Sequence, residues 1–317
     1  MKRFTERTLL NKTFDMAILS LNHVVKKYRD HTAVNDVTFD IQKGSIFGLL
    51  GPNGAGKTSL IRMITMITAP DSGEILLDDQ RLNSAHVQNI GYLPEERGLY
   101  KKMKVAEQLL YLAQLRGLSL ETAKSEVRHW LEKFDASDWW NKTIDELSKG
   151  MQQKIQFIAT VLHKPDLIIL DEPFTGLDPM NTNLIKEEIY RLNNEGVSII
   201  FSTHRMEQVE EICKDIVLIN NGKVVQTGTV NGVKQKFKEH IYKVEFEDRF
   251  NGNLNGSQYK VVSQDANSIV IKNPDETSAN ELLTDLIRSG AQIKSFNEIL
   301  PSLNDVFIKI VENTNQI

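Results

Sequence analysis

The feature that most constrains the fold is a glycine-rich octapeptide, Gly51–Thr58, with the sequence GPNGAGKT. A short apolar run, Ser45–Leu50, precedes it, and apolar residues recur with helical spacing through Lys57–Thr68 after it. Glycines allow the backbone to curl until successive N–H groups face inward, which makes an anion site at the start of a helix. A strand, a glycine loop and a helix in this order predict a phosphate-binding loop in a parallel α/β sheet.

The side chains at the end of this loop suit a nucleoside triphosphate. Lys57 can reach the β- and γ-phosphates, and the Thr58 hydroxyl can ligate Mg²⁺. A glycine turn that matches the pattern by chance is the alternative, but the strand before the loop and the helix after it favour the functional interpretation. The residues expected to bind the nucleotide are Gly51, Pro52, Asn53, Gly54, Ala55, Gly56, Lys57, Thr58 and Ser59.

A second apolar run, Leu167–Leu170, ends in two acidic residues, Asp171 and Glu172. If this run is a buried strand of the same parallel sheet, its carboxyl end lies beside the phosphate-binding loop. Asp171 is then expected to hold Mg²⁺ through water, and Glu172 to act as general base on the water that attacks the γ-phosphate. A solvated acid at the end of a strand is the alternative for Glu172 taken alone.

Patterns along the rest of the chain predict its domains. Residues 99–150 are rich in helix formers and contain no convincing strand, so we expect them to form a helical insertion in an α/β domain over residues 16–235. Residues 240–312 contain short strands and two helices, which predict a separate unit. The expected fold is an α/β P-loop NTPase with a helical insertion subdomain and a small C-terminal α+β domain. The aromatic residues expected to pack the insertion, rather than stack on a ligand, are Trp130, Phe134, Trp139 and Trp140.

Composition excludes several classes of protein. The longest apolar runs fall far short of the ~18 residues of a membrane span. The net charge of −4 gives no global basic field, so attraction to nucleic acid is unsupported. A single cysteine, Cys213, excludes an intrachain disulfide and a multi-cysteine metal site, which fits a reducing cytosol. Residues 1–15 lack the apolar stretch of a secretory signal; they are expected to form a flexible extension, or else to precede a true start at Met16.

Three further features surround the acidic strand in a fixed order. Leu147–Gln152 opens a helix just before the strand, with Ser148 suited to the N-cap position, and Asp178 and His204 come after it. Together with the phosphate-binding loop, or Walker A motif, and the acidic strand, or Walker B motif, they correspond to a signature, a D-loop and a switch histidine. Over roughly Ile18–Val230 the chain therefore resembles the nucleotide-binding subunits of ABC transporters.

The resemblance implies that two such domains meet head to tail around ATP and Mg²⁺, as a homodimer or as paired ATPase subunits. Ser148 and Gly150 of one subunit would contact the γ-phosphate held by the other, since a helix N-terminus attracts phosphate. His204 would contact the same phosphate and help to orient the water. Asp178 would span the two subunits, and Tyr28 would stack on the adenine.

Three positions depart from the family pattern. Lys149 and Met151 stand where the signature usually has glycine and glutamine, but its phosphate-facing serine and second glycine are retained. Glu95 stands where the family commonly has a glutamine that contacts Mg²⁺ and senses the membrane partner. A carboxylate still ligates Mg²⁺, with a stronger charge and no donor, so Glu95 stays an expected metal ligand.

Two segments narrow the resemblance. Gly91–Tyr100 and Leu300–Phe307 are similar to ATPase subunits of type-2 ABC exporters, including sodium-extrusion relatives, whose permease is a separate polypeptide. The resemblance implies a transport motor, peripheral on the cytoplasmic face of the cell membrane, whose ATP-driven closure moves an integral membrane permease. The alternatives are a soluble ABC ATPase that acts on ribosomes or DNA, and a nucleotide-binding scaffold without activity. No nucleic-acid partner is expected, and the C-terminal domain is expected to serve regulation or dimer support.

Overall fold

The computed structural model describes residues 16–96, 98–248, 259–273 and 278–315. The extension expected at residues 1–15 lies outside the described residues. The chain divides between Thr229 and Val230 into two compact units, and we describe each by itself.

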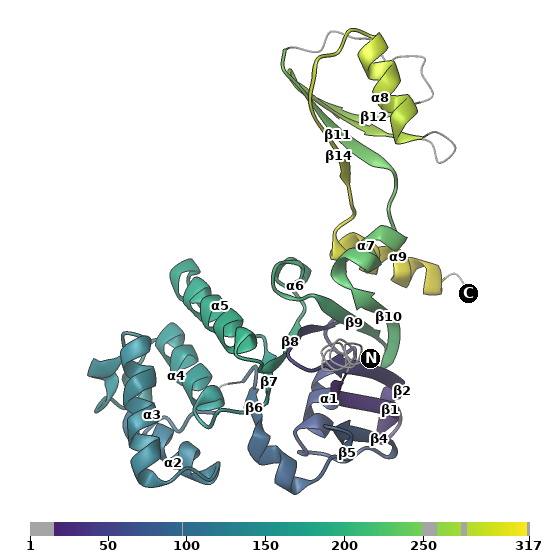
Figure 1. Ribbon diagram of the computed structural model, residues 1–317. Coiled ribbons are helices and arrows are strands. Elements are labelled where there is room, and N and C mark those ends of the chain that lie inside the picture. Colours follow the sequence, from purple (N-terminus) through teal and green to yellow (C-terminus); the bar gives the residue numbers. More distant parts are fainter. Residues whose placement is uncertain (1–15, 97, 249–258, 274–277, 316–317) are drawn as a thin grey trace, which may run out of the picture. The chain divides into compact units, whose positions relative to one another are not determined.

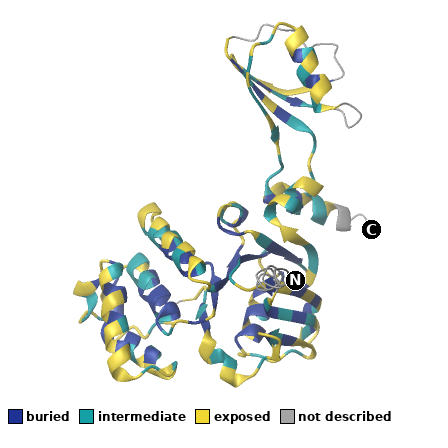
Figure 2. Ribbon diagram, in the orientation of Figure 1, coloured by how far each residue is buried: buried dark blue, intermediate teal, exposed yellow. Residues whose placement is uncertain are grey.

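The first unit contains a six-stranded sheet in the order β10-β9-β3-β8-β7-β6 (Figure 1). The five strands from β9 to β6 are parallel, and β10 is antiparallel to β9. Every residue of β3, β7 and β8 is buried, as expected for strands in the middle of a parallel sheet (Figure 2). The strands are β3 (Ile46–Leu50), β6 (Ile90–Leu93), β7 (Leu167–Asp171), β8 (Ser198–Thr203), β9 (Asp215–Asn220) and β10 (Lys223–Thr229).

An antiparallel sheet of four strands, in the order β2-β1-β4-β5, belongs to the same unit. It consists of β1 (Ala17–Tyr28), β2 (His31–Gln42), β4 (Ser72–Leu77) and β5 (Gln80–Arg81). Helix α1 (Lys57–Ile64) joins the two sheets through one apolar cluster, because its buried side chains pack with those of both. The helix residues in this cluster are Leu60, Ile61, Met63 and Ile64.

Helix α1 ends at Ile64 and is therefore shorter than the sequence pattern, which continues to Thr68, predicts. The Thr65 hydroxyl donates to the Ile61 carbonyl over 2.8 Å, and Met66 adopts a left-handed φ of 58°. That conformation stops a helix, since an L-residue at positive φ cannot continue the right-handed ladder. The apolar residues after Ile64 therefore belong to a turn that leads into β4.

The helical insertion contains α2 (Val105–Leu115), α3 (Leu120–Lys133) and α4 (Lys149–Val161), which pack against one another (Figure 1). Trp130 and Phe134 are buried with ring centroids 6.0 Å apart, and Phe134 reaches Phe157 of α4 at 5.8 Å. Trp139 and Trp140 are only half-buried, under the cationic side chains of α4 and α3 respectively. Trp130 and Phe134 thus belong to the core of the insertion, whereas Trp139 and Trp140 pack at its rim.

The sequence pattern does not predict strand β6 or helix α6 (Met206–Ile212) of this unit. Strand β6 pairs with β7 at the edge of the sheet, and Gly91 lets it approach the insertion, since a Cβ there would lie 2.4 Å from the Thr160 carbonyl oxygen. Helices α5 (Pro179–Asn194) and α6 follow β7 and β8. No helix in the described ranges combines the length and apolar character that crossing a bilayer requires.

The second unit is an antiparallel sheet in the order β12-β13-β11-β14, with the amphipathic helix α8 packed on its apolar face. Its strands and the helices α8 and α9 lie close to the positions that the sequence periodicity predicts, whereas α7 is a helix that the periodicity does not predict. The elements are α7 (Val230–Lys236), β11 (Ile241–Phe246), β12 (Lys260–Gln264), β13 (Ser268–Lys272), α8 (Ala279–Arg288), β14 (Ile293–Ile299) and α9 (Leu303–Asn315). The apolar core of this unit includes Val244, Ile269, Ile271, Leu282 and Leu286.

Candidate nucleotide-binding site

The glycine loop is held by close packing against its own unit. A Cβ at Gly51 would lie 2.2 Å from the Ile219 carbonyl oxygen, and one at Gly56 would lie 2.3 Å from the Ala33 carbonyl oxygen. Both glycines also adopt positive φ values, of 153° and 111°. Only glycine meets both constraints, so the pattern in the sequence has a direct steric cause.

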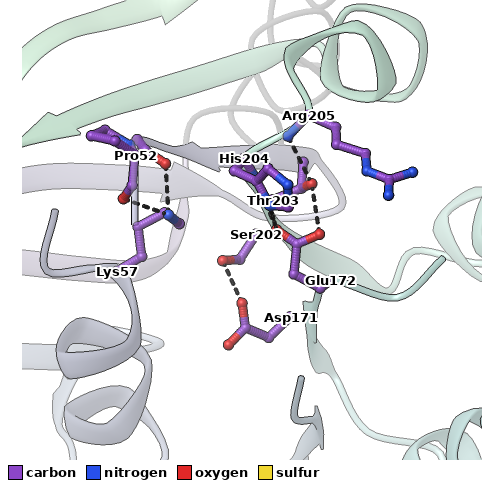
Figure 3. A network of polar contacts seen from close by, with 9 residues as sticks. Pro52, Lys57, Asp171, Glu172, Ser202, Thr203, His204 and Arg205 are labelled. Carbon is purple, nitrogen blue, oxygen red and sulfur yellow. Dashed lines mark hydrogen bonds and ion pairs between the residues drawn. The ribbon is translucent and has the colours of Figure 1, made fainter. Parts of the chain in front are cut away.

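Lys57, the first residue of α1, is 8% exposed. Its Nζ donates to the carbonyl oxygens of Gly51 over 2.6 Å and Pro52 over 3.1 Å (Figure 3). Burial lowers the pKa of Lys57, while the nearby carboxylates of Asp171 and Glu172 raise it. The ammonium group is thus held by the loop's own carbonyls, in a position from which phosphate oxygens can replace them.

A cavity of about 440 Å³ opens beside the loop. It brings together Tyr28, most of the loop and the three acidic residues that the sequence singles out, and it adds His31, which the sequence analysis missed. Its lining residues are Tyr28, His31, Ala33, Asn53, Gly54, Ala55, Gly56, Lys57, Thr58, Ser59, Glu95, Asp171 and Glu172.

Two of these lining residues lie at the rim. Tyr28 is 39% exposed, and the Lys26 ammonium lies 5.6 Å from the centre of its ring, so a base can stack only on the opposite face. Glu95 is exposed and follows the end of β6. Its charge opposes ionisation of Asp171 and supports that of Lys57.

Asp171, the last residue of β7, is 4% exposed and accepts a hydrogen bond of 2.7 Å from the Ser202 hydroxyl. Burial raises the pKa of Asp171, and the hydrogen bond from Ser202 opposes that rise. A buried carboxylate with a raised pKa gains most when a cation arrives, because the cation offsets the cost of its desolvation. This position therefore suits a divalent metal.

Glu172 follows β7 with a left-handed φ of 51°, and its carboxylate turns toward the end of β8 (Figure 3). One oxygen, Oε1, accepts from the His204 backbone N–H over 2.8 Å and lies 2.6 Å from His204 Nδ1. The other, Oε2, accepts from the Thr203 hydroxyl over 3.1 Å. The structure thus joins Glu172 to His204, with the carboxylate held by three donors from one strand end.

Besides Gly51, Pro52 and His204, three predicted site residues lie outside this cavity lining. Ser148 is the exposed N-cap of α4, and its hydroxyl accepts from Met151 N–H over 3.2 Å. Gly150 faces the loop after β7, since a Cβ there would be 3.8 Å from the Gly176 carbonyl oxygen. Asp178 caps α5 by accepting from Asn181 N–H over 2.9 Å, and this hydrogen bond lowers its pKa. In this chain, all three lie at exposed or half-exposed element ends.

Residues that the sequence analysis missed come mainly from β8. Ser202 donates to Asp171, the last residue of β7, and Thr203 donates to Glu172 directly after it. The signal for them was a hydroxyl pair directly before His204 at the end of an apolar run. His31 is the first residue of β2, three positions after Tyr28, and it was missed because no sequence motif includes it.

The donor set fits Mg²⁺ only in company with a nucleotide. In the described residues, no three or more His, Cys, Asp or Glu side chains are grouped to hold a metal by themselves. Mg²⁺ usually takes one or two carboxylates together with substrate phosphates and water, and not a cage made entirely of protein. The Thr58 hydroxyl and the Asp171 carboxylate supply oxygens of the right kind, and both residues line the same cavity.

Comparisons with known proteins agree with this geometry. The family model described as ABC transporter matches residues 34–175, and the model described as ATP-binding protein DrrA1-3-like, C-terminal domain, matches residues 228–311. The uncharacterized ABC transporter ATP-binding protein YhaQ of Bacillus subtilis is 45% identical over 298 residues, which cover 93% of this chain and 98% of that protein.

Two further matches extend the comparison. The lipopolysaccharide export system ATP-binding protein LptB of Escherichia coli is 30% identical over 241 residues, covering 74% of this chain and 99% of that protein. The solved structure of an ATP binding subunit of an ABC transporter has a TM-score of 0.65 at 30% identity, covering 69% of this chain and 93% of that chain.

Proposed function

Because this chain belongs to the family of ABC transporter ATP-binding proteins, we propose that it is the motor of an exporter whose permease is a separate polypeptide. As a member of this family, the chain is an ATPase that serves a transporter. The export direction is the proposal, and the relationship to an ATP-binding protein of an export system supports it.

One observation carries the chemical part of the proposal: a single cavity holds the loop lysine and two acids from the end of β7. Lys57 and the loop N–H groups would bind the phosphates, and Thr58 and Asp171 would hold Mg²⁺. When bound, Mg²⁺ neutralises charge that develops on the phosphate oxygens. Glu172 is the general base, once His204 has turned its ring toward the phosphate.

A second subunit completes the site in this proposal. The exposed Ser148 end of α4 carries free N–H groups and partial positive charge, which suit a phosphate, but it is outside the cavity lining of its own chain. A second copy, or a paired ATPase subunit, would bring its own α4 to the γ-phosphate held here. Asp178 would stand at the contact between the two.

A second cavity of the first unit, about 500 Å³ in volume, is the surface we propose for the permease. It is lined by apolar groups of α2, including Leu112 and Leu115, together with Pro94 and Arg116. Leu115 is 61% exposed, so its side chain is open to contact with a partner. Pro94 precedes Glu95 of the nucleotide cavity, so a permease segment seated here would lie beside the site. The ATPase would thereby be peripheral on the cytoplasmic face of the membrane.

Copurification tests the transport assignment. Tagged protein from detergent-solubilised membranes should recover an integral permease, and Leu115→Glu should abolish that recovery while ATP-dependent thermal stabilisation stays unchanged. Recovery with ribosomes or DNA at near-physiological salt, and without a membrane protein, would favour the soluble alternative.

Substitution of the base tests the chemistry. Glu172→Gln keeps the size of the side chain but removes its basicity, so turnover should fall by roughly a thousandfold. ATP should then trap a dimer on gel filtration, because closure no longer ends in hydrolysis. Unchanged turnover in this variant would remove Glu172 from the role of base.

A further inference from the structure

The hydroxyl of Thr203 lies between two partners at the end of β8. Thr203 is completely buried, with 0% of its surface exposed. Its Oγ1 is 3.1 Å from Glu172 Oε2 and 3.0 Å from the backbone nitrogen of Arg205 (Figure 3). Neither contact follows from the sequence motifs, because Thr203 belongs to none of them.

The chemistry of the partners fixes the direction of both hydrogen bonds. The Arg205 N–H can only donate, so Thr203 Oγ1 accepts from it. An ionised carboxylate can only accept, so the one proton of the hydroxyl points at Glu172 Oε2. Since a hydrogen bond to a charged group is stronger than a neutral one, this contact anchors that oxygen firmly.

The two oxygens of Glu172 therefore differ in how they are held. Oε2 is bound by a buried hydroxyl on a central strand, which has no room to move away. Oε1 is bound by the His204 backbone and by the His204 ring, and that side chain is 50% exposed. When the ring leaves, Oε1 keeps one donor and recovers a lone pair, whereas Oε2 stays engaged.

We propose that Thr203 is a positioning residue that anchors Oε2 of Glu172 and so reserves Oε1 for the attacking water. This inference rests on the role of Glu172 as base in the proposed function. In the step concerned, the water oxygen forms a bond to the γ-phosphorus, and the bond from that phosphorus to the bridging oxygen of ADP breaks. ADP leaves with the electron pair, and a proton of the water passes to Oε1. Thr203 touches none of the reacting atoms.

Two substitutions of Thr203 in the full chain separate positioning from packing. Thr203→Val keeps the branched shape but removes the hydroxyl, so Oε2 loses its donor; Thr203→Ser restores a hydroxyl. We expect kcat for ATP hydrolysis to fall about tenfold in the valine variant, the equivalent of one hydrogen bond to a charged group. We expect KM for ATP and the ATP-dependent thermal shift to stay within about twofold, because Thr203 makes no contact to ATP that the substitution could remove. The serine variant should recover most of kcat.

Thr65→Val is the matched control, since it removes another largely buried threonine hydroxyl that donates to a carbonyl of α1 and not to an acid. It should cost stability without lowering kcat. The inference is overturned if Thr203→Val retains the wild-type kcat, if serine fails to restore it, or if KM rises as much as kcat falls. If Glu172→Gln turns over normally, the proposed base is wrong and this inference falls with it. If Glu172→Gln is inactive while Thr203→Val is normal, only the positioning role is wrong.

Discussion

The two units of the chain differ in where they place charge. The first unit buries Lys57, Asp171 and Glu172 at the ends of neighbouring elements around one cavity. In the described part of the second unit, no charged side chain is buried. Burying a charge is expensive unless a partner compensates for it, so a cluster of buried charges marks the unit that does chemistry.

One further buried acid in the first unit shows the limit of that rule. Glu188 of α5 is 3% exposed and is held by Lys133 of α3 at 2.5 Å and by Arg191 Nε at 2.7 Å. This network ties the helical insertion to the α/β core and lies outside the lining of the nucleotide cavity. Buried charge indicates chemistry only where the partners leave room for a ligand.

In the second unit, charge is used in surface pairs. Glu239 contacts Lys272 of β13 at 2.7 Å and also Lys309 of α9. These two hydrogen bonds lower the pKa of Glu239 to about 2. The three side chains join the segment after α7 to the sheet and to α9, and their partial exposure leaves them screened by solvent.

We expect the strongest contrast between two lysine substitutions, one in each unit. Lys57→Ala removes a buried ammonium that the phosphates need, so turnover should fall by roughly 10²- to 10³-fold. The ATP-dependent rise in stability, about 2.7 kcal/mol at a hundredfold excess over Kd, should also disappear in a thermal-shift measurement. Lys272→Ala should leave both quantities unchanged; an equal loss of ATP binding in that variant would break the contrast between the units.

The next effect is on stability alone. Leu282 is completely buried between α8 and the sheet of the second unit, so Leu282→Ala should cost about 3 kcal/mol of unfolding free energy for that unit. ATP-dependent stabilisation of the first unit should persist in calorimetry. Ile287→Ala, on the exposed side of the same helix, is the control and should cost little. Loss of ATP binding in Leu282→Ala would show that the two units do not act independently.

The smallest effect is electrostatic and depends on pH. Because folding lowers the pKa of Glu239 from its ordinary 4.5 to about 2, its stabilisation is present above pH 4.5 and is lost as pH falls toward 2. Glu239→Gln should therefore cost about 1 kcal/mol at neutral pH, after allowance for solvent screening, and nothing near pH 2. Urea titrations at several pH values measure this difference. The exposed Glu247→Gln is the control, and a cost for Glu239→Gln that is independent of pH would contradict the assignment.

The sequence predicts the site best where its signal is local. The glycine loop is specified by its own residues, because Gly51 and Gly56 leave no room for a Cβ and Gly54 adopts a positive φ. The apolar run before Asp171 and Glu172 likewise indicates the position of these two acids. The sequence does not predict the roles of Ser202 and Thr203, because these depend on the acids at the end of β7, some thirty positions earlier. Only the pairing of β7 with β8 brings these residues together. Nothing in a one-dimensional pattern records which strands become neighbours.

The fold shows the same division. The alternation in β11 and β13 and the helical spacing in α8 predict the second unit well, since each element has one buried face. The sequence pattern does not predict strand β6, because the strand is only four residues long and contains Gly91, which is needed for close packing against α4. The turn at Met66, which ends α1, depends on backbone geometry that apolar spacing does not reveal.

The solitary Cys213 has a practical consequence. It is 7% exposed, and burial raises the pKa of its thiol, so maleimide reagents have little thiolate to attack. A cysteine introduced at Met180, which is 84% exposed beside the cap of α5, would carry a fluorophore with minimal background from the rest of the chain. Self-quenching or energy transfer between two such dyes would then report, in real time and without further engineering, each approach and separation of paired subunits.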